Sequence, residues 1–277
     1  MSPRKILIVG AQGKTGLRVN QRLLQAGIDT VGVSRSTVPS FDWAEPSGWA
    51  QALDGVDAAY LTYHPDLSIP EAEGHIRDFC TQAKAAGLRH VVLLSGRGED
   101  GAARAEDVLR ASGIAWNVVQ ASWFAQNFSE NFMLDSILAG EFVVPAGTSL
   151  EPFIDIDDIA DVAVAALLEP GLHNRTFEVT GPRLMSFADC LQDISSATGR
   201  TVLLREVSME DYVRALEAQE LPAYLIELLP ALFADLFDGR NAYIAPGVTE
   251  ALGRLPTDFK DYAIKTAATG VWAGGAE

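Results

Sequence analysis

The sequence predicts an α/β protein in which a doubly wound parallel sheet is followed by a smaller, mostly helical C-terminal lobe. Short apolar runs alternate with helix-like segments over the first two thirds of the chain, glycines follow several of those segments, and the alternation fades after about residue 183. Strands that alternate with helices pair in parallel, and right-handed crossovers place helices on both faces of the sheet.

Six runs rich in β-branched and aliphatic residues predict the strands of this sheet. They are KILIV (5–9), DTVGV (29–33), DAAYLT (57–62), HVVLLS (90–95), AWNVVQ (115–120) and TFEVT (176–180). Amphipathic segments predict helices at 15–26, 70–86, 102–112 and 157–169. Gly27, Gly87 and Gly113 stand where glycine caps a helix C-terminus. In the lobe, TVLLREV (201–207) predicts one further strand.

Composition limits the classes of function. The 277 residues are 48% apolar, enough for one large core or a core with an appended lobe. The formal charge of −16 argues against nucleic acid as a partner, because phosphate backbones require clustered Lys and Arg. Cys80 and Cys190 are expected to be buried thiols in a reducing compartment. Neither a signal peptide nor an 18-residue apolar run is evident, so we expect a cytoplasmic protein without membrane contact.

A glycine-rich loop follows the first predicted strand. Gly10, Gly13 and Gly16 have the spacing G-x-x-G-x-x-G, which differs from the commoner G-x-G-x-x-G. The N–H groups and dipole at a helix N-terminus attract a pyrophosphate. We therefore predict that cofactor-binding residues include this loop; the alternative is a glycine-rich turn without a ligand. The predicted contacts are Gly10, Gln12, Gly13, Lys14, Thr15 and Gly16.

Ser34 and Arg35 follow the second predicted strand, about 20 residues after the glycines, where NAD-dependent enzymes carry an acidic residue. A guanidinium can instead clamp a 2′-phosphate through two hydrogen bonds, which favours NADP(H) as cofactor. The alternative for Arg35 is a surface ion pair. Strand-end residues Leu61, Thr62 and Ser95 complete the predicted cofactor contacts, although Ser95 could simply cap its strand.

These observations predict a Rossmann-type NAD(P)-binding domain over residues 1–182. A substrate lobe is predicted over 183–277, partly interleaved with residues 124–150.

Several further segments carry a family resemblance that covers nearly the whole chain. It resembles the NmrA-like branch of the atypical short-chain dehydrogenases/reductases in GAQGKTG (10–16), SRS…FDW (34–43), AAYLTYHP (58–65), RHVVLLSGRG (89–98), ASWFAQNFSE (121–130), PFIDIDDIADVAVAAL (152–167) and GRTV (199–202). The resemblance implies an NADP-binding domain and a substrate cleft under the C-terminal lobe. The family includes NADPH-dependent quinone reductases, festuclavine and agroclavine dehydrogenases, and a regulator that binds dinucleotide without apparent turnover. Members usually have Arg-Pro where this chain has Gln120 and Ala121.

The usual catalytic pair of short-chain dehydrogenases is absent from the sequence. No tyrosine is followed by a lysine four residues later, and the helix that would carry the pair reads AEDVLRASG (105–113), with Glu106 and no phenol. Ketone reduction needs a proton donor beside the substrate oxygen. We therefore expect an NADPH-dependent oxidoreductase that reduces an electrophile such as a quinone, an imine or iminium, or an enone. The alternative is a non-catalytic NADP(H)-binding redox sensor that acts through a protein partner.

Residues after the predicted strands are candidates for the site, because ligands bind at the carboxyl edge of an open parallel sheet. Tyr63 and His64 are the catalytic candidates; a packed loop tyrosine and a solvated histidine are the alternatives. For Arg97 the alternative is an ion pair with Glu99, and for the aromatic residues a place in the core. The predicted substrate-pocket residues are Arg97, Ser122, Trp123, Phe124, Asn127 and Phe128.

Two more segments bear on partners. The aspartates of DIDDIAD suit helix capping and the helix dipole better than a metal, so no metal site is predicted from Asp155, Asp157, Asp158 and Asp161. The apolar segment PALFADLF (230–237) suits either a lid over a small-molecule substrate or a homodimer contact.

Overall fold

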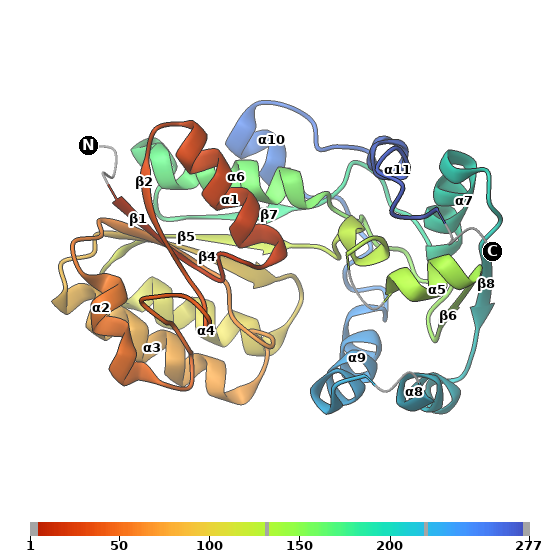
Figure 1. The fold of residues 1–277 in the computed structure, drawn as a ribbon, viewed down its shortest axis with the longest axis horizontal. Helices are drawn as coiled ribbons and strands as arrows, with labels where there is room; N and C mark the ends of the chain where they lie inside the picture. Colours follow the sequence, from red (N-terminus) through yellow and green to blue (C-terminus); the bar gives the residue numbers. More distant parts are fainter. Residues whose placement is uncertain (1–4, 131–132, 219–220, 274–277) are drawn as a thin grey trace. The chain divides into compact units, whose positions relative to one another are not determined.

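The computed structural model describes residues 5–130, 133–218 and 221–273. The chain forms two compact units (Figure 1). The first comprises Met1–Ala121, Ile156–Val179 and Ala245–Leu255; the second comprises Ser122–Asp155, Thr180–Ile244 and Pro256–Glu277. The chain thus passes repeatedly between the units, whereas the sequence predicts a main boundary at residue 182, with residues 124–150 partly interleaved with the lobe.

The first unit contains a six-stranded sheet of order β2-β1-β3-β4-β5-β7, and all of its strands are parallel. The six predicted strands are all present; β1 and β2 have the predicted bounds, and the ends of the other four differ from the prediction by at most one residue. Because β2 and β3 lie on opposite sides of β1, the strand order reverses at β1. Open α/β sheets bind ligands at the carboxyl ends of the strands beside such a reversal. The strands are β1 (Lys5–Val9), β2 (Asp29–Val33), β3 (Ala58–Leu61), β4 (His90–Gly96), β5 (Ala115–Ala121) and β7 (Arg175–Val179).

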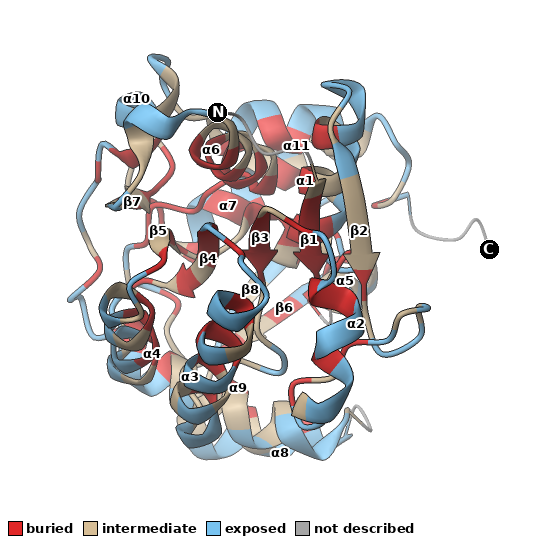
Figure 2. Cartoon of the chain, turned by 90° about the vertical axis from the view of Figure 1, so that its left-hand side faces the viewer, coloured by how far each residue is buried: buried red, intermediate tan, exposed pale blue. Residues whose placement is uncertain are grey.

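Helices cover both faces of this sheet, and Figure 2 shows buried strands between helices with exposed outer faces. On one face α1 (Lys14–Gln25) packs against α6 (Ile156–Leu168). On the other face α3 (Pro70–Ala85) packs against α4 (Asp100–Ala111), with α2 (Trp49–Leu53) beside α3. The short turns η1 (Pro46–Gly48) and η3 (Pro170–Leu172) complete these layers. The fold class predicted from the alternation is confirmed.

The core beneath α2 and α3 is unusually aromatic. Phe41 stacks on Trp49 with ring centroids 5.1 Å apart, and both rings contact Phe79 of α3. Trp43 packs edge-on against Phe41, and its indole N–H donates to the carbonyl of Thr62 at 3.0 Å. Burying one such ring stabilises the fold by about 1.5–3 kcal/mol. This cluster therefore anchors the loop that follows β3.

A distant segment returns to the first unit. Helix α10 (Gly247–Leu252) packs on α6 and β7, and Pro246 forms a β-bridge with Val179. A Cβ on Gly247 would lie 2.2 Å from the carbonyl oxygen of Glu178, so only glycine allows this approach. Arg254 then pairs with Asp158 and Asp161 of α6, each at 2.6 Å. The predicted boundary did not anticipate this return, because its contacts are distant in sequence.

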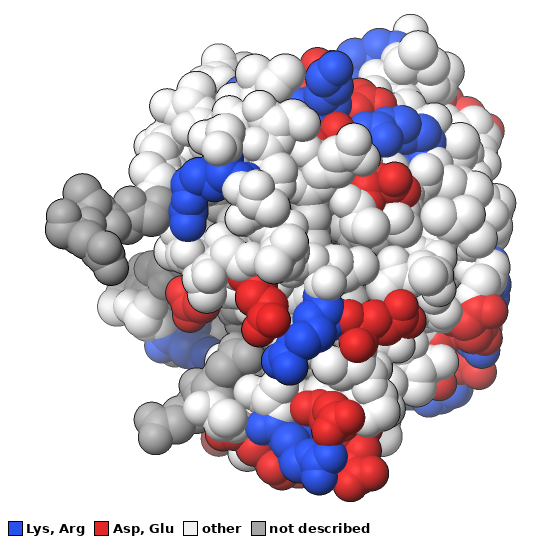
Figure 3. All heavy atoms as spheres, turned by 90° about the vertical axis from the view of Figure 1, so that its right-hand side faces the viewer, with Lys and Arg blue, Asp and Glu red and all other residues white. Residues whose placement is uncertain are grey.

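The second unit packs helices around a two-stranded parallel sheet. Its strands are β6 (Glu141–Val144) and β8 (Leu203–Glu206), and only β8 is predicted by the sequence. On the face drawn in Figure 3, acidic and basic side chains are interspersed among uncharged ones. The helical elements are η2 (Ala125–Phe128), α5 (Met133–Ala139), α7 (Phe187–Thr198), α8 (Met209–Ala218), α9 (Ala223–Leu236) and α11 (Phe259–Ala267).

Other sequence-based expectations can be compared with the described residues. Cys80 and Cys190 are free and buried, and burial raises the pKa of the Cys80 thiol to about 11. The segment 230–237 lies mostly in α9, whose Phe233 and Leu236 are buried in the second unit's core. Among the described helices, none has the length and apolar character needed to cross a bilayer.

Candidate active site

The glycine-rich loop joins β1 to α1 at the carboxyl edge of the sheet. Gly10 has a φ of +79°, and a Cβ there would lie 2.1 Å from Thr62 Oγ1, which donates to the carbonyl of Val9. A Cβ on Gly16 would lie 2.2 Å from the carbonyl oxygen of Gly10. Gly13 is the N-cap of α1, and no side-chain hydrogen bond caps this helix in the described part of the chain. Backbone N–H groups at this helix end can therefore face an anion.

The loop after β2 lies beside the glycine loop. Gln12 Oε1 accepts hydrogen bonds from the hydroxyls of Ser34 (3.3 Å) and Ser36 (3.0 Å). Arg35 is exposed, and its positive charge interacts electrostatically with His64, which follows β3. Burial and then Arg35 lower the pKa of His64, so this imidazole is neutral at pH 7. The structure thus brings together the predicted cofactor residues that follow β1, β2 and β3. Leu61 differs from the other predicted cofactor residues, because its side chain is fully buried in the core.

Tyr63 packs into the aromatic core of the first unit. Its hydroxyl lies 2.7 Å from His75 Nδ1, and its ring lies 5.0 Å from that of Trp43. Burial, with smaller contributions from Glu71 and Asp42, raises the pKa of Tyr63 to about 12. This arrangement corresponds to a packed loop tyrosine, and a phenol with this pKa is a weak acid at neutral pH. A catalytic role for Tyr63 stays a prediction.

Gln120, which departs from the pattern of the family that the chain resembles, contacts a buried carboxylate. Glu106, only 1% exposed, accepts a hydrogen bond from Ser95 Oγ at 2.5 Å. Gln120 Nε2 donates to both of its carboxylate oxygens at 2.9 Å, and Arg110 donates to Oε2 at 2.7 Å. The register of the sheet places Ser95 beside Gln120, which makes this network possible. The Ser95 hydroxyl is therefore directed at α4, and its contact with a cofactor stays a prediction.

Arg97 has a different partner from the one the sequence suggested. Its guanidinium is 3% exposed and donates to Glu178 of β7. Its backbone N–H donates to the carbonyl of Ala121, which holds the turn after β4 against β5. The predicted pairing of Arg97 with Glu99 is replaced by this contact across the sheet, because β7 brings Glu178 to the same edge.

Sequence reasoning did not anticipate the partner of Glu99. Its side chain folds back over Gly96, so that a Cβ on this glycine would lie 2.2 Å from Glu99 Oε1. The carboxyl of Asp66, in the loop after β3, lies near that of Glu99. Burial first, then Asp66 and Glu106, raise the pKa of Glu99 to about 8. The signal available was a carboxylate directly after a strand-end S-G-R-G turn, with no indication of what it meets.

The other predicted pocket residues belong to the second unit. Ser122 is buried and donates to the carbonyl of Pro152 at 2.6 Å. Trp123 is partly buried, with its ring 4.8 Å from Phe237. Phe124 and Asn127 are also partly buried. Phe128 is a correction: it is fully buried and stacks on Phe142 at 5.5 Å, so its side chain belongs to the core rather than to a pocket surface.

The aspartates of α6 are engaged by arginines. Arg22 pairs with Asp157 at 2.8 Å and with Asp161 at 2.6 Å, which ties α1 to α6. In the preceding loop Asp155 accepts from Gln126 Nε2 at 2.6 Å. Within the described ranges, no group of three or more His, Cys, Asp or Glu side chains is arranged to hold a metal ion.

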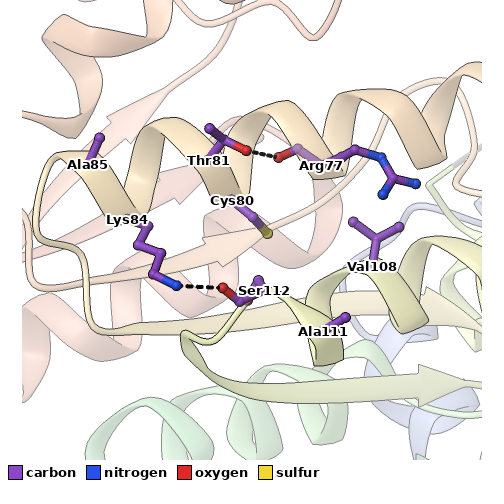
Figure 4. A pocket seen from close by; sticks show the side chains of 8 residues that line it. All are labelled: Arg77, Cys80, Thr81, Lys84, Ala85, Val108, Ala111 and Ser112. Atoms are coloured by element: carbon purple, nitrogen blue, oxygen red, sulfur yellow. Dashed lines mark hydrogen bonds between the residues drawn. The ribbon is translucent and has the colours of Figure 1, made fainter.

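A groove of about 540 Å³ lies between α3 and α4 (Figure 4). Its two cations are engaged: Arg77 pairs with Glu73 at 2.7 Å, and Lys84 donates to the carbonyl of Ser112 at 3.1 Å. None of the predicted site residues lines it. The lining residues are Arg77, Cys80, Thr81, Lys84, Ala85, Val108, Ala111 and Ser112.

Comparison with known proteins gives relatives over most of the chain, although no family model matches it. Prestalk A differentiation protein A of Dictyostelium discoideum is 27% identical over 233 residues, covering 83% of this chain and 77% of that protein. An NAD(P)H azoreductase of Xenophilus azovorans is 29% identical over 281 residues, covering 93% and 96%. Triphenylmethane reductase of Citrobacter sp., solved with NADP(H), has the same fold, with a TM-score of 0.81, 19% identity, and coverage of 95% and 99%. These relatives and the fold confirm that the chain resembles the NmrA-like atypical short-chain dehydrogenases/reductases.

Proposed function

We propose that this protein is an NADPH-dependent reductase that transfers a hydride to a small electrophile such as a quinone, an iminium or an enone. The glycine loop carries this proposal, because a Cβ on Gly10 would meet Thr62 and a Cβ on Gly16 would meet the carbonyl of Gly10, so the turn packs too closely for a side chain at either position. Gly10, Gly13 and Gly16 therefore fit the pyrophosphate of a dinucleotide. Arg35, exposed beside Ser34 and His64, would hold a 2′-phosphate.

The chemistry of the site favours acceptors that are already electrophilic. A bound NADPH supplies the hydride. Glu106 stands on the helix where a short-chain dehydrogenase would carry its tyrosine, and Ser95, Gln120 and Arg110 hold it as a buried structural group. The residues of the first unit would thus bind and orient the dinucleotide and limit water around the reacting carbon. The relative that is an NAD(P)H azoreductase supports conjugated acceptors of this kind.

A non-catalytic redox sensor is the second candidate. One relative is named as a differentiation protein and not as an enzyme, which supports it. A sensor would use the same dinucleotide site but would need a protein partner that distinguishes the two redox states.

Fluorescence titration with NADPH and NADH, followed by addition of a quinone and a cyclic iminium in the same cuvette, tests the proposal. We expect tighter binding of NADPH and oxidation that depends on the acceptor. Equal affinities for the two cofactors would contradict the assignment of Arg35. Tight binding without oxidation across a broad acceptor panel would favour the sensor.

Location and assembly are also proposed. The two free, buried thiols fit a reducing compartment such as the cytoplasm. A homodimer is proposed from the apolar helix α9, with Tyr224 of this helix 42% exposed. Sedimentation of the wild type and of Tyr224→Lys tests the dimer, and an unchanged mass would contradict it.

A further inference from the structure

The loops that follow β1 and β2 are hydrogen bonded to each other. The backbone N–H groups of Gly10 and Ala11 both donate to the carbonyl of Val33, at 3.0 and 3.2 Å. These bonds join the start of the glycine loop to the last residue of β2. Gln12 is therefore held beside Ser34, the first residue after β2.

The turn after β2 is fixed before any ligand arrives. Thr37 Oγ1 accepts from the N–H of Ser34 and donates to the carbonyl of Pro39, each at 2.8 Å. The N–H of Phe41 donates to the carbonyl of Ser34 at 2.9 Å, and Phe41 stacks in the buried aromatic core. Because this turn is already ordered, a ligand that binds to it loses little affinity to ordering the chain.

Two serine hydroxyls in this turn converge on one acceptor. Ser36 Oγ donates to Gln12 Oε1 at 3.0 Å, and Ser34 Oγ donates to the same oxygen at 3.3 Å. The two hydroxyl oxygens lie 3.2 Å apart. Gln12 and Ser36 are exposed, so a ligand can take the place of the amide. A phosphate oxygen is the stronger acceptor, because hydrogen bonds to an ionised group are about twice as strong as those between neutral groups.

The charges of the two loops favour an anion at the same place. Arg35 lies between the two serines and is exposed. From Gly10 to Phe41 the sequence contains one carboxylate, Asp29, which begins β2 at the opposite end of the strand. The end of β2 is also where a dinucleotide fold meets the 2′ position of the adenosine ribose. A phosphate at this position therefore gains a guanidinium and two hydroxyl donors, and a 2′-hydroxyl gains no ion pair.

We propose that Ser34, Arg35 and Ser36 together bind the 2′-phosphate of NADPH, and that Gln12 Oε1 holds the two hydroxyls in place when this phosphate is absent. The proposal rests on the dinucleotide site of the proposed function. Ser36 is then a specificity-determining residue for NADPH over NADH. Gln12 is a positioning residue whose side chain must release the hydroxyls, so it competes with the phosphate.

Two nucleotides isolate the 2′-phosphate from hydride transfer. Adenosine 2′,5′-bisphosphate carries this group and adenosine 5′-monophosphate lacks it, and titration calorimetry measures the affinity for each. In Ser36→Ala we expect the affinity for the bisphosphate to fall about tenfold, the contribution of one charge-assisted hydrogen bond, and that for the monophosphate to stay unchanged. Ser40→Ala, the same change at an exposed position of the same loop, is the control and should change neither affinity.

Substitutions of Gln12 test its competing role. Gln12→Ala removes the competing oxygen, so the affinity for the bisphosphate should hold or rise. Gln12→Glu turns the acceptor into a carboxylate beside Arg35, and this affinity should fall at least about tenfold. Gln25→Glu, the same charge change at the exposed last residue of α1, is the control for net charge. If Gln12→Ala weakens the bisphosphate by more than about threefold, Gln12 assists the phosphate and its proposed role is overturned.

The outcomes for the phosphate site and for the reductase can be told apart. If Ser36→Ala binds the bisphosphate as tightly as the wild type, the role of Ser36 is overturned, even where the wild type reduces acceptors with NADPH. If Ser36→Ala loses affinity as expected and no acceptor oxidises NADPH, the phosphate site stands and the reductase function fails. If the wild type binds both nucleotides equally, the phosphate site and the assignment of Arg35 fail together.

Discussion

Strand β4 has a titratable group with a shifted pKa near each of its ends, and the two pKa values are shifted in opposite directions. At the carboxyl end, burial and like charge keep the acid Glu99 protonated and raise its pKa to about 8. At the amino end, burial keeps the base His90 neutral and lowers its pKa to about 4. Both groups are therefore uncharged near pH 6, where ordinary values would leave the carboxyl charged and half or more of the imidazole charged.

The partners of the two groups differ in a way that matters for function. Asn117 donates to the carbonyls of Leu172 and Arg175, which directs its Oδ1 at His90 Nε2, 2.9 Å away. This geometry assigns the proton to Nε2 of a neutral imidazole, and the ring stacks on His173 with centroids 3.9 Å apart. His90 is 4% exposed, whereas Glu99 is partly open to solvent. The amino end is thus built for stability, and the carboxyl end can exchange a proton.

The largest expected effect is a loss of stability when His90, at the amino end of β4, becomes protonated. The pKa of His90 is about 4 in the folded chain and 6.5 as the ordinary value, so the unfolded chain binds more protons between these pH values. Stability from neutral His90 is present above pH 6.5 and is lost as pH falls towards 4, by about 3 kcal/mol. Urea unfolding of the wild type and of His90→Gln at pH 7 and pH 4.5 measures this difference. An equal loss in both proteins would contradict the assignment, since carboxylates common to both would then explain it.

The next effect concerns the cofactor at the carboxyl edge. Arg35→Asp removes a charge-assisted clamp of about 1.5–3 kcal/mol, so NADPH affinity should fall roughly 10- to 100-fold while NADH affinity holds or rises. Fluorescence titration checks both cofactors. Arg77→Asp, on the outer face of α3 and 59% exposed, is the matched control. If the control weakens NADPH binding as much, the effect comes from net charge and not from a clamp.

A smaller effect is expected at the carboxyl end of β4, where the stability of the folded chain should fall as Glu99 loses its proton at high pH. The folded chain holds the Glu99 proton up to about pH 8, whereas an ordinary glutamate loses it near 4.5. Between these values the folded state binds more protons, so its stability decreases as pH rises, by on the order of 2 kcal/mol after allowance for solvent. Glu99→Gln should remove this slope and be more stable than the wild type at pH 8.5. A parallel pH dependence of the two melting temperatures would refute it.

The smallest effect is expected at Tyr63. Its hydroxyl is bonded to His75 and its pKa is about 12, so Tyr63→Phe should change turnover by less than about twofold. Steady-state kinetics with a quinone measures this. A loss above tenfold with unchanged NADPH binding would restore Tyr63 as the proton donor.

Local pattern was enough for most of the sheet and for the glycine loop. The six strands of the main sheet are read from runs such as KILIV, because a strand buried on both faces is apolar throughout. The loop from Gly10 to Gly16 is recognisable because its tight turn and close packing admit only glycine at fixed positions. In contrast, β6 is not predicted, and it pairs with β8, a strand about 60 residues further along the chain.

The sequence by itself determined the alternation of strands and helices and the place of a dinucleotide loop, because periodicity and turn chemistry act between near neighbours. Only the tertiary structure decided that Glu99 lies near Asp66, that Gln120 satisfies the buried Glu106, and that Arg97 crosses to Glu178. Each of these contacts joins side chains from different strands or loops. Burial and charge at such points depend on which segments the fold brings together, and no pattern within one segment encodes it.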